Sequence, residues 1–169
     1  ETAHGVRRAY ESRGQDFPEI ATDSRWNEFD LGDLYRAMAD HLAQDDPRFK
    51  REYEHMMEVL EDEDHDVHRR HNYCDTAVVR AWTEGRHPYD GESWQQFQSR
   101  ILSPLDTLSR HESGEKIAVI TSATPIGIWA GQALETSGRM MWRLAGAAFN
   151  AGVTTFRVSE GGVRLFTFN

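Results

Sequence analysis

Cysteine, long apolar runs and positive charge are all scarce in this sequence, and each shortage excludes a class of protein. Cys74 is the only cysteine among 169 residues, so no internal disulfide can form and we expect a cytoplasmic location. No apolar run approaches the roughly 20 residues that cross a bilayer, and no signal peptide is recognisable, so no membrane partner is expected. Lys and Arg number 19 against 28 Asp and Glu, and the net charge of −9 disfavours nucleic acid as a partner.

The most informative stretch runs from Lys116 to Trp129. An apolar run over residues 116–122 passes into small residues and then into Pro125. This order predicts a strand, a tight turn and a helix, with Thr124 as N-cap and Pro125 as the first helical residue. Such a junction directs unpaired backbone N–H groups to one place at the carboxyl end of a strand, where phosphates bind in α/β proteins.

Periodic apolar residues predict helices in the middle of the chain and strands toward its ends. Charge-rich helices are expected from residue 31 to residue 84, and Ser93 is the expected N-cap of the next helix. Further predicted elements are helices at residues 1–14, 126–137 and 140–150 and strands at 153–159 and 163–168. We therefore predict a single α/β domain over residues 1–169, with a helical insert at 31–90. About four strands is few for a sheet, which typically has roughly five to six, so a core strand is expected to be missing from the printed sequence.

Five segments in consistent order and spacing resemble the histidine phosphatase superfamily, also called phosphoglycerate mutase-like. Residues 25–30, which read Arg-Trp-Asn-Glu-Phe-Asp, are similar to the loop that carries the family's acidic proton donor. Residues 119–126 occupy the place of the strand and turn that usually read Val-Ser-His-Gly-Gly. The other matching segments are residues 1–3, Gly91-Glu92-Ser93 with Arg100, and the closing strands at 150–156 and 165–169.

The resemblance implies a fold, a reaction and a set of site residues. The fold would be a three-layer α/β sandwich, here without its first strand. The intact protein would hydrolyse or transfer the phosphate of a small phosphorylated substrate through a phosphohistidine. Glu28 would protonate the leaving group and then activate water, while Ser122 and the N–H groups of Ala123 and Thr124 would hold phosphoryl oxygens. The family needs no metal and no cofactor, because arginine and histidine neutralise the phosphate.

Two departures from the family pattern leave alternatives open. The Arg-His-Gly motif, whose histidine becomes phosphorylated, has no counterpart here, which implies a nucleophile upstream of Glu1. The second pocket histidine corresponds to Ser122, which can donate a hydrogen bond but brings no positive charge. One alternative is therefore a catalytically inactive domain that binds a phosphorylated ligand or has a regulatory role. Another is an interaction module built on the acidic helices at residues 31–84.

Several residues also have a simpler interpretation than catalysis. His4 is preceded by no apolar strand, so we predict an exposed helix histidine there. His65, His68 and His71 are three residues apart and drift around a helix, which favours a solvated face over a metal site. Glu28 could be an acid that the dipole of a nearby helix favours. The sequence does not decide the substrate, the choice between mutase and phosphatase, or whether the chain forms a homo-oligomer.

Overall fold

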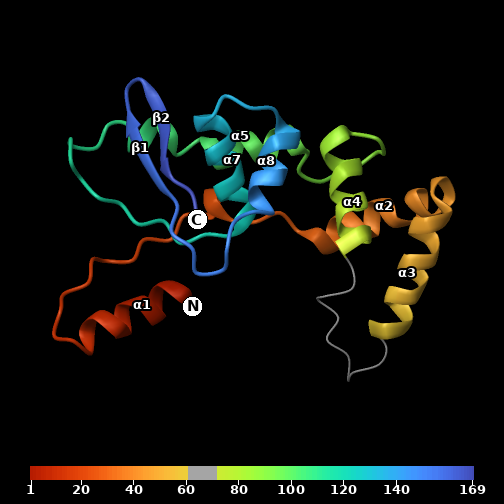
Figure 1. Ribbon diagram of the computed structural model, residues 1–169, viewed down its shortest axis with the longest axis horizontal. Helices are drawn as coiled ribbons and strands as arrows, with labels where there is room; N and C mark the ends of the chain where they lie inside the picture. The colour runs from red at the N-terminus through yellow and green to blue at the C-terminus, as the bar shows by residue number, and fades with distance from the viewer. Residues whose placement is uncertain (61–71) are drawn as a thin grey trace. The chain divides into compact units, whose positions relative to one another are not determined.

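The computed structural model describes residues 1–60 and 72–169 (Figure 1). Within these ranges helices dominate, and the strands form one antiparallel hairpin. In chain order the elements are α1 (Thr2–Glu11), the 3-10 turn η1 (Ser24–Trp26), α2 (Leu31–Asp45), α3 (Pro47–Leu60), α4 (Asn72–Glu84), α5 (Trp94–Leu102), α6 (Leu105–Leu108), α7 (Ala123–Ala133), α8 (Gly138–Ala145), β1 (Thr155–Ser159) and β2 (Gly162–Thr167). This mixture of helices and strands is consistent with the predicted α/β class in its general sense.

The chain forms two compact units, which we describe separately. The first unit comprises Glu1–Glu28 and Arg100–Asn169, and the second, the helical unit, comprises Phe29–Ser99. The helical unit contains the whole insert predicted at residues 31–90. That residues 1–169 form a single domain stays a prediction.

The helical unit is built from α2, α3 and α4, which pack against one another. Leu34, Met38 and Leu42 lie on one face of α2 and are at most 5% exposed, as their helical spacing predicts. Trp82 and Cys74 are buried on α4. Burial raises the pKa of the Cys74 thiol to about 11, so this thiol is protonated and unreactive at neutral pH.

Side-chain hydrogen bonds mark the starts of two helices in this unit. At α2, a carboxylate oxygen of Asp30 accepts from the N–H of Asp33 at 3.0 Å. At α5, Ser93 Oγ accepts from the N–H of Gln96 at 3.3 Å, and Gln96 Oε1 accepts from the N–H of Ser93 at 2.8 Å. This reciprocal pair is a capping box, and it confirms Ser93 as the predicted N-cap.

The first unit has α7 and α8 packed closely together. A Cβ atom placed on Gly127 of α7 would lie 2.5 Å from the backbone N of Ala145 and from the carbonyl oxygen of Met141. Only a residue without a side chain fits this contact between the two helices. Trp129 of α7 is 3% exposed and donates from Nε1 to the carbonyl oxygen of Ile101 at 2.9 Å, which fastens the end of α5 to α7.

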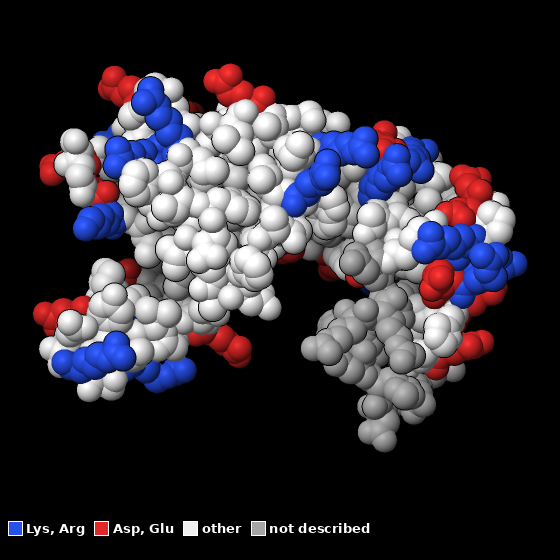
Figure 2. Space-filling view, in the orientation of Figure 1, with Lys and Arg blue, Asp and Glu red and all other residues white. Residues whose placement is uncertain are grey.

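The hairpin of β1 and β2 also packs on α7. Phe156 of β1 lies opposite Leu165 of β2, and its ring meets Trp129 edge-on, with 5.8 Å between the ring centroids. Gly162 follows the turn with a φ of +107°, a conformation that glycine adopts at little cost. The predicted hairpin is thus confirmed. Figure 2 shows Lys and Arg side chains over this hairpin, which carries Arg157 and Arg164.

The prediction of a strand at residues 116–122 is wrong. This segment pairs with no strand among the described residues. Its side chains at Ile117, Val119 and Ile120 are 47%, 40% and 47% exposed. An apolar segment becomes a strand only when a second segment supplies hydrogen-bond partners, and the two described strands pair with each other. Local pattern alone could not show that this partner is lacking.

The described ranges show neither a metal site among their histidines and carboxylates nor a membrane-spanning helix. His4 lies on α1 and is exposed, as predicted. The predicted solvated face with His65, His68 and His71 lies outside the described residues. Within residues 1–60 and 72–169, no group of three or more His, Cys, Asp or Glu side chains is arranged to hold a metal. No helix in those ranges combines the length and the apolar character needed to cross a membrane.

Candidate functional site

The start of α7 is the turn that the sequence predicts as an anion site. Ser122 is its N-cap, with φ −98° and ψ −179°, and the Ser122 side chain makes no capping hydrogen bond. The prediction of Thr124 as N-cap is therefore wrong, because Thr124 and Pro125 lie inside the first turn. Proline lacks an N–H, and first-turn N–H groups have no acceptor within the helix, so Pro125 fits any position there. Its presence does not fix where the helix begins.

Glu28 lies against this helix start. Its Oε2 accepts a hydrogen bond from the backbone N–H of Thr124, with 3.2 Å between Oε2 and N. Glu28 is exposed, Ser122 is half-buried and Thr124 is only 4% exposed. A carboxylate is stabilised at this place by the positive end of the helix dipole. The structure thus brings Glu28 into contact with Thr124 at the helix start that Ser122 and Ala123 also form, although the chain separates Glu28 from Thr124 by 96 positions.

Hydrogen bonds between Asp23 and Arg25 stabilise the turn that precedes Glu28. Asp23 caps the 3-10 turn η1 by accepting from the N–H of Arg25 at 2.9 Å. The Arg25 guanidinium also donates to both carboxylate oxygens of Asp23, at 2.7 to 3.0 Å. These bonds hold the pKa of Asp23 below its usual range and raise the pKa of Arg25. At neutral pH the pair therefore stabilises the turn directly ahead of Glu28.

Two further side chains hold the same loop from other elements. Arg100, in the last turn of α5, is half-buried. Its Nη1 donates to three loop carbonyl oxygens, those of Ser24 (3.2 Å), Arg25 (3.1 Å) and Asn27 (3.0 Å). Thr121 donates from Oγ1 to the carbonyl oxygen of Trp26 at 2.7 Å. Every carbonyl from residue 24 to residue 27 thus accepts a hydrogen bond from a distant side chain.

Sequence reasoning missed the contacts of Arg100 and Thr121. The sequence indicates only a structural cation at Arg100, in the helix that follows Gly91-Glu92-Ser93, and it gives Thr121 no role beyond the turn. The loop carbonyls that these side chains bind are 73 to 76 and 95 positions away along the chain. Patterns of neighbouring residues carry no information on such distant pairs.

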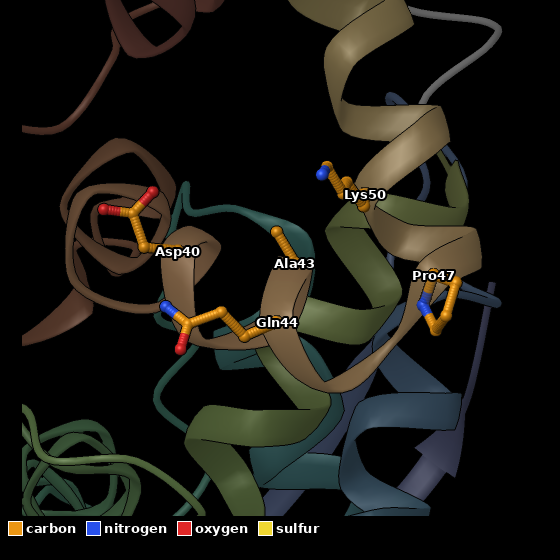
Figure 3. A pocket seen from close by; sticks show the side chains of 5 residues that line it. All are labelled: Asp40, Ala43, Gln44, Pro47 and Lys50. Atoms are coloured by element: carbon orange, nitrogen blue, oxygen red, sulfur yellow. The ribbon is translucent and has the colours of Figure 1, made fainter.

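A separate hollow lies in the helical unit (Figure 3). It has a volume of about 560 Å³. Its lining residues are Asp40, Ala43 and Gln44 of α2 and Pro47 and Lys50 of α3. Asp40 and Lys50 are both exposed, and the lining contains no nucleophile with an adjacent base. The hollow therefore gives no second candidate for a reaction centre.

A comparison with known protein families gives a match that covers the α7 turn. A family model of the histidine phosphatase superfamily (branch 1) matches residues 53–169. The match includes Arg100 and the turn at residues 122–124, whereas Glu28 precedes the matched range. No curated protein and no solved structure matches the chain. Because the match spans well over half of the sequence, the chain belongs to the histidine phosphatase superfamily.

Proposed function

We propose that the intact protein hydrolyses or transfers the phosphate of a small phosphorylated substrate, with Glu28 as the proton donor and the start of α7 as the phosphate site. The observation that carries this proposal is the hydrogen bond between Thr124 N–H and the Glu28 carboxylate. It supports a proton donor within hydrogen-bonding reach of the groups that would hold phosphoryl oxygens. Membership of the superfamily supports the reaction class in general.

The phosphate would bind at residues 122–124. Ser122 would donate through its hydroxyl, and Ala123 and Thr124 through their backbone N–H groups, at the positive end of the helix dipole. Since Glu28 now accepts from the Thr124 N–H, a phosphoryl oxygen would displace the carboxylate. The displaced carboxyl group would then lie beside the bound phosphate, where its acid form can donate to the ester oxygen.

The reaction would run in two halves. By resemblance to the superfamily, a histidine upstream of this chain attacks phosphorus, and the departing alcohol takes its proton from Glu28. In the second half, Glu28 accepts a proton from water as the water oxygen attacks the phosphohistidine, which releases inorganic phosphate. If a second alcohol replaces water, the phosphate is transferred instead. The three-layer α/β sandwich and the cytoplasmic location belong to the same proposal.

Ser122 favours an alternative function. A neutral hydroxyl at the N-cap of α7 gives the site less positive charge than the histidine expected there by resemblance. Losing one preorganised donor to the transition state typically costs roughly 3 to 4 kcal/mol. The alternative is a catalytically inactive domain that binds a phosphorylated ligand at the same turn.

Hydrolysis of phenyl phosphate by the intact protein, which includes the upstream histidine, and by its Glu28→Gln variant tests the proposed role of Glu28. Glutamine keeps the size of the side chain but cannot donate a carboxyl proton, so we expect kcat to fall by about 100-fold or more. Glu19→Gln removes another exposed carboxylate from the same unit and should leave turnover unchanged. Equal and measurable turnover in the intact protein with Glu28→Gln and in the unaltered intact protein would contradict the mechanism.

Binding of orthophosphate separates the two candidate functions. In nitrogen-15 NMR spectra, orthophosphate should shift the amide signals of Ala123 and Thr124 in both cases. These shifts together with turnover by the intact protein support the enzyme, and these shifts without turnover by the intact protein support the inactive binding domain. Shifts confined to other residues would contradict both functions.

A further inference from the structure

We propose that Arg100 is a positioning residue that holds the carboxyl group of Glu28 at the start of α7. The inference rests on the proposed function in so far as it assigns Glu28 a part in the reaction. The contacts by which Arg100 would hold Glu28 do not depend on that role. It concerns the guanidinium of Arg100, the loop at residues 24–27 and the Glu28 side chain that follows this loop.

The loop at residues 24–27 offers its carbonyl oxygens to side chains from elsewhere in the first unit. Three of the four carbonyls converge on one nitrogen, Nη1 of Arg100, at 3.0 to 3.2 Å. The fourth, that of Trp26, accepts from Thr121 Oγ1. Because Glu28 comes directly after this loop, the position of its backbone follows from these bonds.

These contacts form a closed path that begins and ends on α7. Trp129 of α7 binds the carbonyl oxygen of Ile101, which is the neighbour of Arg100 on α5. Arg100 binds the loop at residues 24–27, the loop leads to Glu28, and the Glu28 carboxylate returns to α7 at Thr124. Removing Arg100 opens this path between α5 and the loop that leads to Glu28.

The positive charge of Arg100 is needed because three carbonyl dipoles point at one place. Carbonyl oxygens that converge in this way repel one another, and a cation between them offsets the repulsion. Arg100→Met would leave these acceptors without their shared donor, so the loop would have to open toward water. Arg100→Lys keeps a charge and three donors on a shorter side chain, and should restore the contact only in part.

The amide signal of Thr124 reports the Glu28 contact directly and needs no turnover. We expect Arg100→Met to move this signal toward its position in Glu28→Ala, which has no acceptor for the Thr124 N–H, and Arg100→Lys to move it less. Arg110→Met alters an exposed arginine of the same unit and should leave the signal in place. If Arg100→Met does not fold, Arg100→Lys decides: a Thr124 signal at the unaltered position overturns the proposal.

Kinetics with two leaving groups distinguish positioning from a general structural effect. Phenyl phosphate releases a stronger base than p-nitrophenyl phosphate and depends more on a proton donor. In the intact protein, Arg100→Met should therefore lower kcat/KM, which reports the leaving-group step, by about 10- to 100-fold for phenyl phosphate and by less for p-nitrophenyl phosphate. An equal fall of kcat/KM for both substrates would overturn the positioning role.

A double variant adds a second criterion. If Arg100 acts through Glu28, adding Arg100→Met to Glu28→Gln lowers kcat no further. An equal loss in both backgrounds would overturn the proposal. Failure of the proposed function is recognised separately, because Glu28→Gln alone would then leave turnover unchanged while the Thr124 signal still tests the contact.

Discussion

Asp23 accepts hydrogen bonds from both the backbone N–H and the guanidinium of Arg25, directly ahead of the loop that leads to Glu28. Donors of this kind favour the ionised carboxylate, so the pKa of Asp23 lies below its usual value of about 3.9. We expect Arg25→Met to return the pKa of Asp23 to the usual range. Carbon-13 NMR titration of the Asp23 carboxyl group measures both values.

The lowered pKa of Asp23 also sets the sign of a pH effect on stability. Because the folded-state pKa is depressed, the stability from this pair is present above about pH 4 and is lost as the pH falls through the folded-state value. The loss is small, since the Arg25 and Asp23 side chains are 40% and 33% exposed and solvent screens their charges. Arg13→Met changes an exposed arginine of the same unit and should not alter the Asp23 titration. An ordinary pKa for Asp23 in the unaltered chain would contradict the contact.

Single residues show where sequence reasoning succeeds and where it fails. Ser93 could be predicted as an N-cap because its partner Gln96 is three positions away. Thr124 was a wrong choice because Ser122 offers the same chemistry two residues earlier and Pro125 tolerates either start. Glu28 was identified through family resemblance, and its contact with Thr124 spans 96 positions that no local pattern links.

At the scale of elements too, the sequence predicts what depends on neighbouring residues and fails where an element depends on a distant segment. Helical spacing in α2 and the glycines of the β1–β2 turn are local patterns, and both predictions were confirmed. A strand is different, because its hydrogen bonds come from a second segment. Residues 116–122 have the composition of a strand but no partner strand among the described residues, so composition alone gave the wrong element.

The contact between α7 and α8 leads to a prediction at this scale. In Gly127→Ala the new Cβ would meet backbone atoms of Ala145 and Met141, which cannot turn aside as a side chain can. We expect the free energy of unfolding to fall by about 1 to 3 kcal/mol, the usual cost of overpacking. Denaturation in urea, monitored by circular dichroism, measures the change.

Gly5→Ala in α1 is the matched control. The nearest atom to a Cβ on Gly5 belongs to the Arg8 side chain at 3.9 Å, so the substitution meets no clash. Alanine favours a helix over glycine by roughly 1 kcal/mol, and Gly5→Ala should therefore stabilise the protein slightly. If Gly127→Ala were stabilising as well, the close approach of α7 and α8 would be wrong.

For the whole molecule, the net charge and the exposed apolar side chains have opposite effects on association between copies of the chain. A net charge of −9 opposes association between copies. Exposed apolar side chains favour it, and Ile117, Val119 and Ile120 lie together on one extended stretch. Residues 116–120 make no backbone hydrogen bond to another described residue. Such a segment is a template for strand pairing between chains, so we propose that the chain forms a homo-oligomer.

Sedimentation velocity at low and high salt tests whether charge repulsion or the apolar stretch at residues 116–120 controls association. Salt shortens the Debye length from about 10 Å at 0.1 M to about 3 Å at 1 M, so association of the unaltered chain should increase with salt. Val119→Lys places a charge within the extended stretch and should keep the chain monomeric at both salt concentrations. Val153→Lys makes the same charge change at a side chain that is 72% exposed in the same unit, and it should behave like the unaltered chain. If both lysines increased association equally, the smaller net negative charge rather than the stretch at residues 116–120 would control it. A monomer at every salt concentration would mean that the exposed apolar side chains are too few to join two copies.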